Sequence, residues 1–131
     1  MEKGPIDWKD LHDKLHRGQV DLSQFLNELD KKYWTERNQY GDTFLHIACF
    51  YNQTQAVKML LESKVISVDA LNALGRTPII DSICSNSLST LDLLLMAGAS
   101  KTILDKNGQG PYDFAKIAYH ATPECRKRLG M

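Results

Sequence analysis

The sequence predicts an all-α solenoid in which four helix-turn-helix units stack side by side. The first observation behind this prediction is a period: Gly41, Gly75 and Gly108 lie 34 and 33 residues apart, each inside a turn-like segment. A period in the low thirties is typical of stacked helical repeats, because one unit cannot bury its apolar face without neighbours. The second observation is the order of signals within a period, which runs turn, short helix, turn, longer helix.

The period from 72 to 104 contains each of these signals. Gly75 lies in a turn because glycine accepts positive φ without strain. Thr77 is expected to cap a short helix through its hydroxyl, and Pro78 follows at the first helical position, where its missing donor costs nothing. Asn86 ends this helix, because asparagine tolerates the left-handed conformation. The second helix carries one apolar stripe, Leu88, Leu91, Leu94 and Leu95.

The period from 38 to 71 repeats this plan. Thr43 caps its first helix, and Asn52, which lies 34 residues before Asn86, closes that helix. The residues expected to face inward are Leu45, Ala48 and Cys49 on the first helix and Ala56, Val57, Leu60 and Leu61 on the second.

The first and last copies diverge from this plan, as terminal repeats of a solenoid do because their outer faces meet solvent. In the first copy Gly18 takes the place of Asn52. The last copy keeps Pro111 and ends in a helix that starts at Thr122 and Pro123. We therefore expect a single domain over residues 1–131 with repeats at about 5–37, 38–71, 72–104 and 105–131. The inward residues of the terminal copies are Trp8, Leu11, Leu15, Leu22, Phe25, Leu26, Leu29, Tyr112, Ala115, Cys125 and Leu129.

These segments resemble the ankyrin repeat, whose hallmark is Thr-Pro-Leu-His-x-Ala-Ala followed by a glycine and a helix with a Val…Leu-Leu pattern. The segment 43–49 (Thr-Phe-Leu-His-Ile-Ala-Cys), the pair 77–78 (Thr-Pro) and the segment 93–99 (Leu-Leu-Leu-Met-Ala-Gly-Ala) carry the match, which covers essentially the whole chain. The resemblance implies a binding module whose turn tips and first helices line a concave groove. A chain of this length is similar to small ankyrin inhibitors and adaptors.

Composition excludes several classes of partner. The 131-residue chain has formal net charge zero, so it lacks the basic excess on which sequence-independent nucleic-acid binding depends. Its apolar runs are far shorter than the roughly 20 residues that cross a bilayer, and no signal peptide is recognisable at its start. We expect no nucleic-acid, membrane or small-molecule ligand, a monomer when unbound, and a cytoplasmic and possibly also nuclear location.

The three cysteines, Cys49, Cys84 and Cys125, cannot all pair within one chain and lie in no metal-binding spacing. This pattern favours a reducing, intracellular setting. The main interpretation is that the cysteines are small hydrophobes between helices. A reactive thiol is the alternative for Cys84, which lies at a variable position of its repeat.

The inventory of reactive groups predicts no enzyme, no cofactor and no metal site. Among the four histidines, His46 occupies the structural position of the resembled family, where the side chain hydrogen-bonds neighbouring turns. His12 and His16 lie four residues apart on one helix and could clamp a metal, but no third ligand follows at a recognisable spacing. Asp81 and Asp92 are expected to cap helices or face solvent. The basic run 126–128 is explained by the dipole at a helix C-terminus.

The repeat phase predicts which residues line the concave face and bind a partner protein. Four of them, Tyr40, Phe50, Tyr51 and Leu74, are large apolar or aromatic groups that core packing does not require, and exposed clusters of this kind mark interfaces. The alternative is that Phe50 or Tyr51 packs over the adjacent repeat. The complete predicted site consists of Arg17, Gln39, Tyr40, Asp42, Phe50, Tyr51, Leu74, Arg76, Ser85, Lys106 and Asn107.

The expected function is non-enzymatic binding of a partner protein through this groove. An inhibitor or masking protein of a signalling or transcription factor is the favoured form. The alternative is an adaptor or a structural subunit of a larger assembly, including a viral or bacterial protein that intercepts host signalling.

Overall fold

The computed structural model describes residues 5–131, and within that range the chain is helical with no strand. This confirms the predicted all-α solenoid. Eight α-helices follow one another in pairs, with a short 3-10 helix, η1 (Lys31–Tyr33), between the first and second pairs. The helices are α1 (Trp8–His16), α2 (Leu22–Glu28), α3 (Phe44–Phe50), α4 (Thr54–Ser63), α5 (Pro78–Cys84), α6 (Leu88–Met96), α7 (Pro111–Ile117) and α8 (Pro123–Arg128).

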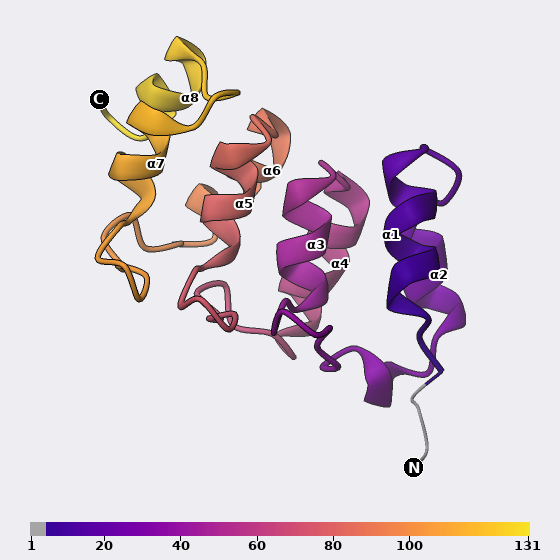
Figure 1. Cartoon of the computed structure of the whole chain (residues 1–131). Coiled ribbons are helices and arrows are strands. Elements are labelled where there is room, and N and C mark those ends of the chain that lie inside the picture. Colours follow the sequence, from indigo (N-terminus) through magenta and orange to yellow (C-terminus); the bar gives the residue numbers. More distant parts are fainter. Residues whose placement is uncertain (1–4) are drawn as a thin grey trace.

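The helix pairs stack in chain order from one end of the molecule to the other (Figure 1). The odd-numbered helices form one layer, in which α3 packs on α5 and α5 on α7. The even-numbered helices form a second layer, in which α4 lies between α2 and α6, and α6 packs on α8. The first and last described residues therefore lie at opposite ends of the array, and each pair buries its apolar face against its neighbours.

The core runs continuously along the stack between the two layers. The predicted inward residues are buried or packed against the core, and Phe44, Leu60 and Leu91 are fully enclosed. Each such side chain contributes about 2 kcal/mol through removal of apolar surface from water. Asn52 and Asn86 end their helices with φ of 53° each, which confirms the predicted left-handed positions.

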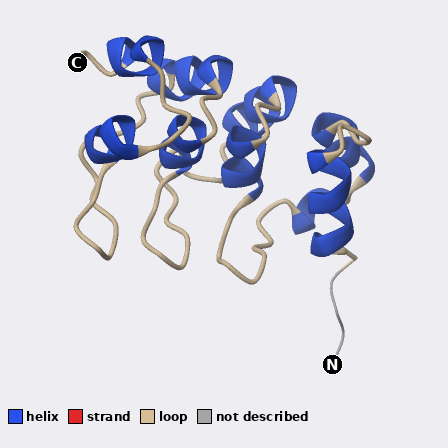
Figure 2. Ribbon diagram, turned by 45° about the horizontal axis from the view of Figure 1, so that its top comes forward, coloured by secondary structure: helices blue, strands red, loops and turns tan. Residues whose placement is uncertain are grey.

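The hairpin-like turns between helix pairs project from one side of the stack as a row of loops (Figure 2). Asn38, Asn72 and Asp105 start equivalent turns, and each accepts through its side-chain Oδ1 from the backbone N–H groups two and four residues further on. The turns are also linked to one another: the Ala73 N–H donates to the Tyr40 carbonyl at 2.9 Å, and the Lys106 N–H repeats this one turn later, at 3.0 Å. The row of tips is therefore a fixed edge rather than a set of independent loops.

The first helices of the second and third repeats, α3 and α5, begin differently. The Thr43 side chain accepts from the His46 N–H, and His46 Nδ1 accepts in turn from the Thr43 N–H at 3.2 Å. His46 Nε2 then donates to the Arg76 carbonyl at 2.9 Å, which ties the second repeat to the third and agrees with the predicted structural role. Thr77 is the N-cap residue of α5 as predicted, but the predicted hydrogen bond of its hydroxyl is absent, because Oγ1 is enclosed without a partner. Pro78 occupies the first turn as predicted.

The cysteines are free thiols that pack within the array. Burial raises the pKa of the Cys84 thiol to about 11, and the nearby Asp81 adds to this shift. A thiol with such a pKa is almost entirely protonated at neutral pH, so the reactive alternative for Cys84 is not supported. In the described part of the chain, the helices are all too short to be membrane spans.

Candidate functional site

A pocket of about 240 Å³ opens on the layer of odd-numbered helices, where the second repeat meets the third. It draws residues from α1, from the turn before α3, from α3 itself and from α5. Four of the predicted partner-binding residues meet here. The lining consists of His12, Tyr40, Asp42, His46, Ile47, Phe50, Tyr51 and Asp81.

Three aromatic rings form the exposed rim of this pocket. Tyr40 is 62% exposed and Phe50 is 46% exposed, although both are large and apolar enough to be core residues. Phe50 meets Tyr51 edge to face, with ring centroids 5.1 Å apart. Tyr51 is half-buried because its ring also packs on His12 of the first repeat at 5.9 Å. The alternative of packing over a neighbour therefore holds in part for Tyr51, while Phe50 stays open to solvent.

Two hydrogen bonds in series link Asn38 to His12 and His12 to Tyr51. Asn38 Oδ1 is occupied by two backbone donors, so its Nδ2 faces His12 Nε2 at 3.2 Å and donates to it. Nε2 is therefore the unprotonated nitrogen of the ring, and Nδ1–H donates to the Tyr51 hydroxyl at 3.3 Å. In this arrangement the Tyr51 hydroxyl oxygen is the acceptor.

Two carboxylates form the floor of the pocket. One oxygen each of Asp42 and Asp81 and one nitrogen of His46 lie within 4.8 Å of one another. Asp42 is held by the Asn72 amide, which donates to its Oδ1 at 2.9 Å. The side-chain carboxyl of Asp81 has no hydrogen-bond donor among the residues described, and its Oδ2 is fully enclosed. Burial raises the pKa of Asp81 well above its usual range, Asp42 adds to that shift and Arg76 opposes it.

The position of Asp81 corrects the sequence prediction. It caps no helix: it lies in the first turn of α5, it is only partly exposed, and it lines the pocket floor. Asp92 follows the prediction more closely, because it is half-exposed and pairs with Arg128 at 2.7 Å. The sequence did contain a signal for the unusual position of Asp81, because this residue lies between Ile79, Ile80 and Ile83. A charged residue inside an apolar helical stretch is costly.

The acidic cluster does not fit a metal ion. A metal would need the lone pair of the His46 imidazole, but Nδ1 already accepts from Thr43 and Nε2 carries the proton donated to the Arg76 carbonyl. Metal binding would therefore open the helix cap and the link between two repeats. Within residues 5–131, no group of three potential ligands forms around His12 and His16.

The other predicted site residues are spread along the same face. Leu74 is 49% exposed at the next turn tip, and the last tip presents two further exposed side chains, Lys106 and Asn107. Gln39 lines a second hollow of about 330 Å³ between α1 and the turn before α3. Arg17 is exposed at the far end of α1, outside both hollows.

Arg76 and Ser85 are engaged within the chain. Arg76 Nε donates to Asp105 Oδ2 at 3.1 Å, and its guanidinium lies 4.9 Å above the ring of Phe114. Ser85 donates to the carbonyl of Asp81 at 2.8 Å. Both residues therefore serve the scaffold, although part of each side chain remains on the surface.

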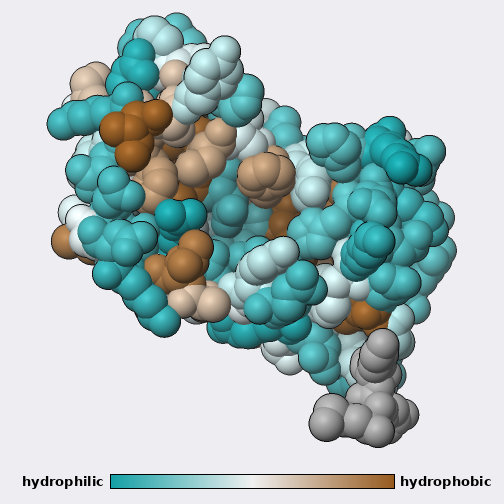
Figure 3. All heavy atoms as spheres, in the orientation of Figure 1, coloured by the Kyte–Doolittle hydropathy of each residue, from teal (hydrophilic) through white to brown (hydrophobic). Residues whose placement is uncertain are grey.

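The apolar character of this face is uneven. Figure 3 shows apolar atoms gathered over α5 and α7, whereas the surface over α1 is almost entirely hydrophilic. The exposed apolar residues at the α5 and α7 end include Leu74 and Ile117, the latter 61% exposed. The pocket lies at the transition between these two surfaces.

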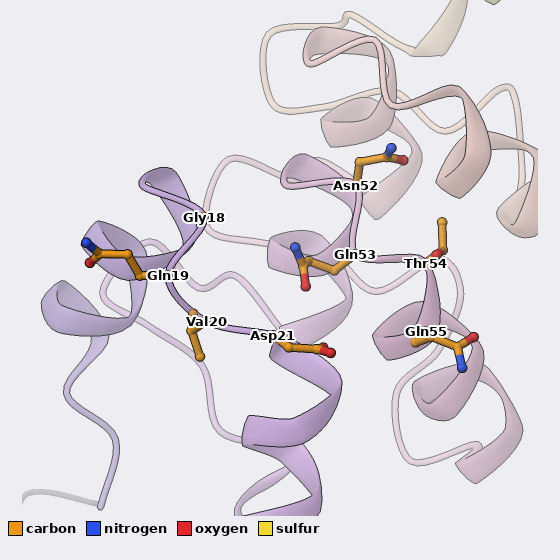
Figure 4. Close-up of a pocket in the computed structure, with 8 residues that line it drawn as sticks. All are labelled: Gly18, Gln19, Val20, Asp21, Asn52, Gln53, Thr54 and Gln55. Carbon is orange, nitrogen blue, oxygen red and sulfur yellow. The ribbon is translucent and has the colours of Figure 1, made fainter.

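A larger hollow of about 460 Å³ lies elsewhere, between the turn that joins α1 to α2 and the turn that joins α3 to α4 (Figure 4). Gln53 spans it, since its Oε1 accepts from the Leu22 N–H at 3.1 Å. Asp21 is exposed, and hydrogen bonds from Ser23 lower the pKa of its carboxyl. This hollow is a shallow polar seam between repeats, without an aromatic wall or an unsatisfied buried group.

Comparison with known proteins places these features in context. A family model for ankyrin repeats, three copies, matches residues 11–105. The chain is 34% identical over 98 residues to the B-cell lymphoma 3 protein homolog of Mus musculus, which covers 72% of this chain and 21% of that protein. It is 27% identical to the E3 ubiquitin-protein ligase KEG of Arabidopsis thaliana (71% of this chain, 6% of the ligase) and 34% identical to the tyrosine-protein kinase HTK16 of Hydra vulgaris (64% and 12%). The chain thus matches only a minor part of each relative.

Proposed function

The chain belongs to the ankyrin-repeat family, whose repeats are protein-protein interaction modules, and from this premise we propose that it binds a partner protein through its concave face. The pocket between the second and third repeats is the centre of the proposed interface. The proposed role is that of a non-enzymatic inhibitor or masking protein for a signalling or transcription factor, acting as a monomer in the cytoplasm or nucleus. The proposal includes the whole predicted set of groove residues, from Arg17 to Asn107.

One observation carries the proposal: large aromatic side chains are exposed around a hollow, although the core does not need them there. Tyr40 and Phe50 lie at the rim, and Leu74 continues the surface at the next tip. Aromatic anchors that surround a pocket are the usual centres of binding energy in interfaces. Ordered turns support them, so little conformational entropy is lost when a partner docks.

An adaptor is the second candidate function. The relatives that match include a ubiquitin ligase and a kinase, of which the matched repeats are 6% and 12%. In such proteins the repeats are one part among others. An adaptor would hold a second partner through a surface other than the groove, whereas a masking protein needs the groove alone.

The test uses exposed residues, so that truncation leaves the core intact. The groove variant combines Tyr40→Ala, Phe50→Ala and Leu74→Ala. The matched control combines Met96→Ala and Val65→Ala, which remove exposed apolar side chains at the ends of α6 and α4. Partners are captured on the wild-type protein, identified by mass spectrometry, and measured against all three proteins by calorimetry.

We expect the groove variant to bind the captured partner at least about 100-fold more weakly, since hot-spot truncations each cost about 2 kcal/mol. The control should bind within about twofold of wild type. Retained binding by a folded groove variant would contradict the proposal. A second partner held equally by both variants would favour the adaptor.

A further inference from the structure

We propose that the pocket between α3 and α5 receives a single lysine side chain of the partner protein. This inference rests on the proposed function and specifies the chemistry at the centre of the interface. It is carried by three features of the pocket: an acidic floor without a cation, an enclosed carboxyl oxygen without a donor, and an aromatic rim.

The first feature is the charge of the floor. Asp42 and Asp81 bring carboxylate oxygens within 4.8 Å of one another. The ion pairs of the described residues all lie elsewhere, on Asp10, Asp92 and Asp105. Arg76 is the basic residue that opposes the pKa shift of Asp81, but it is held by Asp105 and stacked on Phe114 in the next repeat. The floor therefore holds two carboxyl groups, and neither forms an ion pair with a cation of the described chain.

The second feature is the Asp81 carboxyl itself. Its Oδ2 is inaccessible to solvent and has no hydrogen-bond partner, which is rare for a buried polar atom and calls for an explanation. The titratable and charged groups around it are Asp42 before α3, His46 and Cys49 on α3, Arg76 before α5, and Cys84 on α5. Burial favours the protonated form of this carboxyl, whereas an incoming ammonium group would favour the ionised form. Binding should therefore release a proton and strengthen as the pH rises.

The third feature is the shape and lining of the pocket. A volume of about 240 Å³ is below the roughly 300 Å³ at which ligand pockets usually begin, and suits one long side chain. Tyr40, Phe50 and Tyr51 present aromatic rings beside the path to the floor, and such rings attract cations through their π faces. The aliphatic stem of a lysine would lie against these rings while its head reaches the carboxylates.

The geometry favours an ammonium over a guanidinium. Two oxygens no more than 4.8 Å apart can both lie at about 2.8 Å from one nitrogen, the usual length of a charge-assisted hydrogen bond. A lysine head is a compact charge with three donors that can be shared between Asp42 and Asp81. A guanidinium is a planar fork that pairs best with both oxygens of one carboxylate, whereas the oxygens here come from two different carboxylates.

The test is a titration of isotope-labelled protein, followed by NMR of the backbone amides. The probes are the N-acetyl, N′-methylamide derivatives of lysine, of arginine and of norleucine, which has the lysine stem without the charge. We expect the lysine probe to shift the amides of Phe50, Tyr51 and Asp81 in a saturable manner, with an affinity at least about tenfold above that of norleucine. Its affinity should rise as the pH increases above about 4, the ordinary pKa of aspartate.

Two variants and one control locate the effect. Asp81→Asn keeps the shape of the carboxyl but removes its charge, and should weaken lysine binding at least about tenfold. Phe50→Leu keeps apolar volume at an exposed position but removes the ring, and should weaken lysine binding several-fold without changing norleucine. Asp10→Asn removes the same charge from the exposed surface of α1 and should leave binding unchanged.

Equal shifts with lysine and norleucine would overturn the proposal, as would full lysine affinity in Asp81→Asn or tighter binding of arginine than of lysine. If Asp81→Asn does not fold, Phe50→Leu and the probe series decide alone. Failure of the lysine test, combined with loss of partner binding in the groove variant, would leave the proposed function standing. If the lysine probe binds but the groove variant still binds the partner protein, the proposed function is contradicted while the lysine site remains.

Discussion

Two carboxylates in neighbouring repeats, Asp105 and Asp81, have opposite environments. Asp105 accepts from the Asn107 and Gln109 N–H groups through Oδ1 at 2.8 and 3.0 Å, and from Arg76 through Oδ2. These bonds, that of Gln109 above all, outweigh desolvation and lower its pKa. Asp105 is shielded from solvent mainly by the residues of its own turn and by Arg76. Asp81 has no described donor, and burial raises its pKa.

This difference separates scaffold from site within one repeating architecture. The junction between α5 and α7 is closed, because Arg76 satisfies Asp105 and covers Phe114. The junction between α3 and α5 leaves a hollow with an unsatisfied acid on its floor. A buried polar group without a partner costs stability and persists where function needs it.

The largest effect on stability is expected at His46, whose ring nitrogens both form hydrogen bonds. His46→Ala removes the bonds to Thr43 and to the Arg76 carbonyl and leaves a cavity, so the free energy of unfolding should fall by about 3 kcal/mol. Urea unfolding measures this loss. His16→Ala, at an exposed position of α1, is the control and should stay within about 0.5 kcal/mol of wild type.

His46 also predicts a pH dependence. Burial lowers the pKa of its imidazole, so below the ordinary value of about 6.5 the unfolded chain binds a proton that the folded chain refuses. Its stabilising contribution is complete above that pH and is lost as the pH falls. Wild-type stability should therefore decline between pH 7 and pH 5 more steeply than that of His46→Ala. Parallel curves would show that His46 is not held neutral.

The turn tips offer a matched pair of glycines with the same φ of +74°. A Cβ at Gly41 would lie 2.7 Å from the backbone nitrogen of Ala73, which donates to the Tyr40 carbonyl, whereas a Cβ at Gly108 meets nothing within 4 Å. Gly108→Ala should cost about 1 kcal/mol from backbone strain alone. Gly41→Ala should cost about 2 kcal/mol more, because the ladder between turns must move. Equal losses in thermal melts would mean that the tips are not locked together.

A smaller effect of opposite sign is expected at the two carboxylates. Asp81→Asn should raise the free energy of unfolding at pH 7 by about 1–2 kcal/mol, because a carboxyl with a raised folded pKa destabilises the fold above its unfolded pKa. The gain should vanish as the pH falls to about 4. Asp105→Asn should lower the melting temperature at pH 7, with a difference that shrinks as the pH falls through the lowered pKa of Asp105. A loss of stability in Asp81→Asn at pH 7 would assign that residue to the scaffold.

The smallest effect is expected at Tyr51. Tyr51→Phe removes the hydroxyl that accepts from His12 at 3.3 Å but keeps the ring, so stability should fall by only about 0.5 kcal/mol. Chemical denaturation at high precision measures the change. A loss above about 2 kcal/mol would indicate that the contact between the first two repeats depends on this hydrogen bond.

The fold could be predicted from the sequence because its signals are local and repeated. The turn glycines, the N-cap Thr43 and the helix-ending asparagines each determine the backbone only of the few residues around them. These local signals recur with the period of the repeat. The turn residues Asn38, Asn72 and Asp105 recur with the same period, three residues before each glycine. Their role in the turns could have been predicted from this spacing but was not.

The site was predicted only in part, because its chemistry depends on side chains that meet across repeats. The aromatic rim follows from repeat phase, and the structure brings Tyr40, Phe50 and Tyr51 together. The partners of Asp81 and Arg76 do not follow from phase, since Arg76 could extend toward either neighbouring repeat and in fact contacts Asp105. The missing hydrogen bond of Thr77 also does not follow from the sequence pattern, since Thr43 at the equivalent position makes one.

The central claim is that Asp81 is kept unsatisfied so that a cation from a partner can bind it. The most direct test is ¹³C NMR titration of the side-chain carboxyl carbons of Asp81 and Asp105, with and without the lysine probe. In the free protein Asp81 should titrate well above Asp105, and saturation with the probe should lower the pKa of Asp81 while leaving Asp105 unchanged. An Asp81 that titrates near 4, the ordinary value for aspartate, and does not respond to the probe would contradict the account.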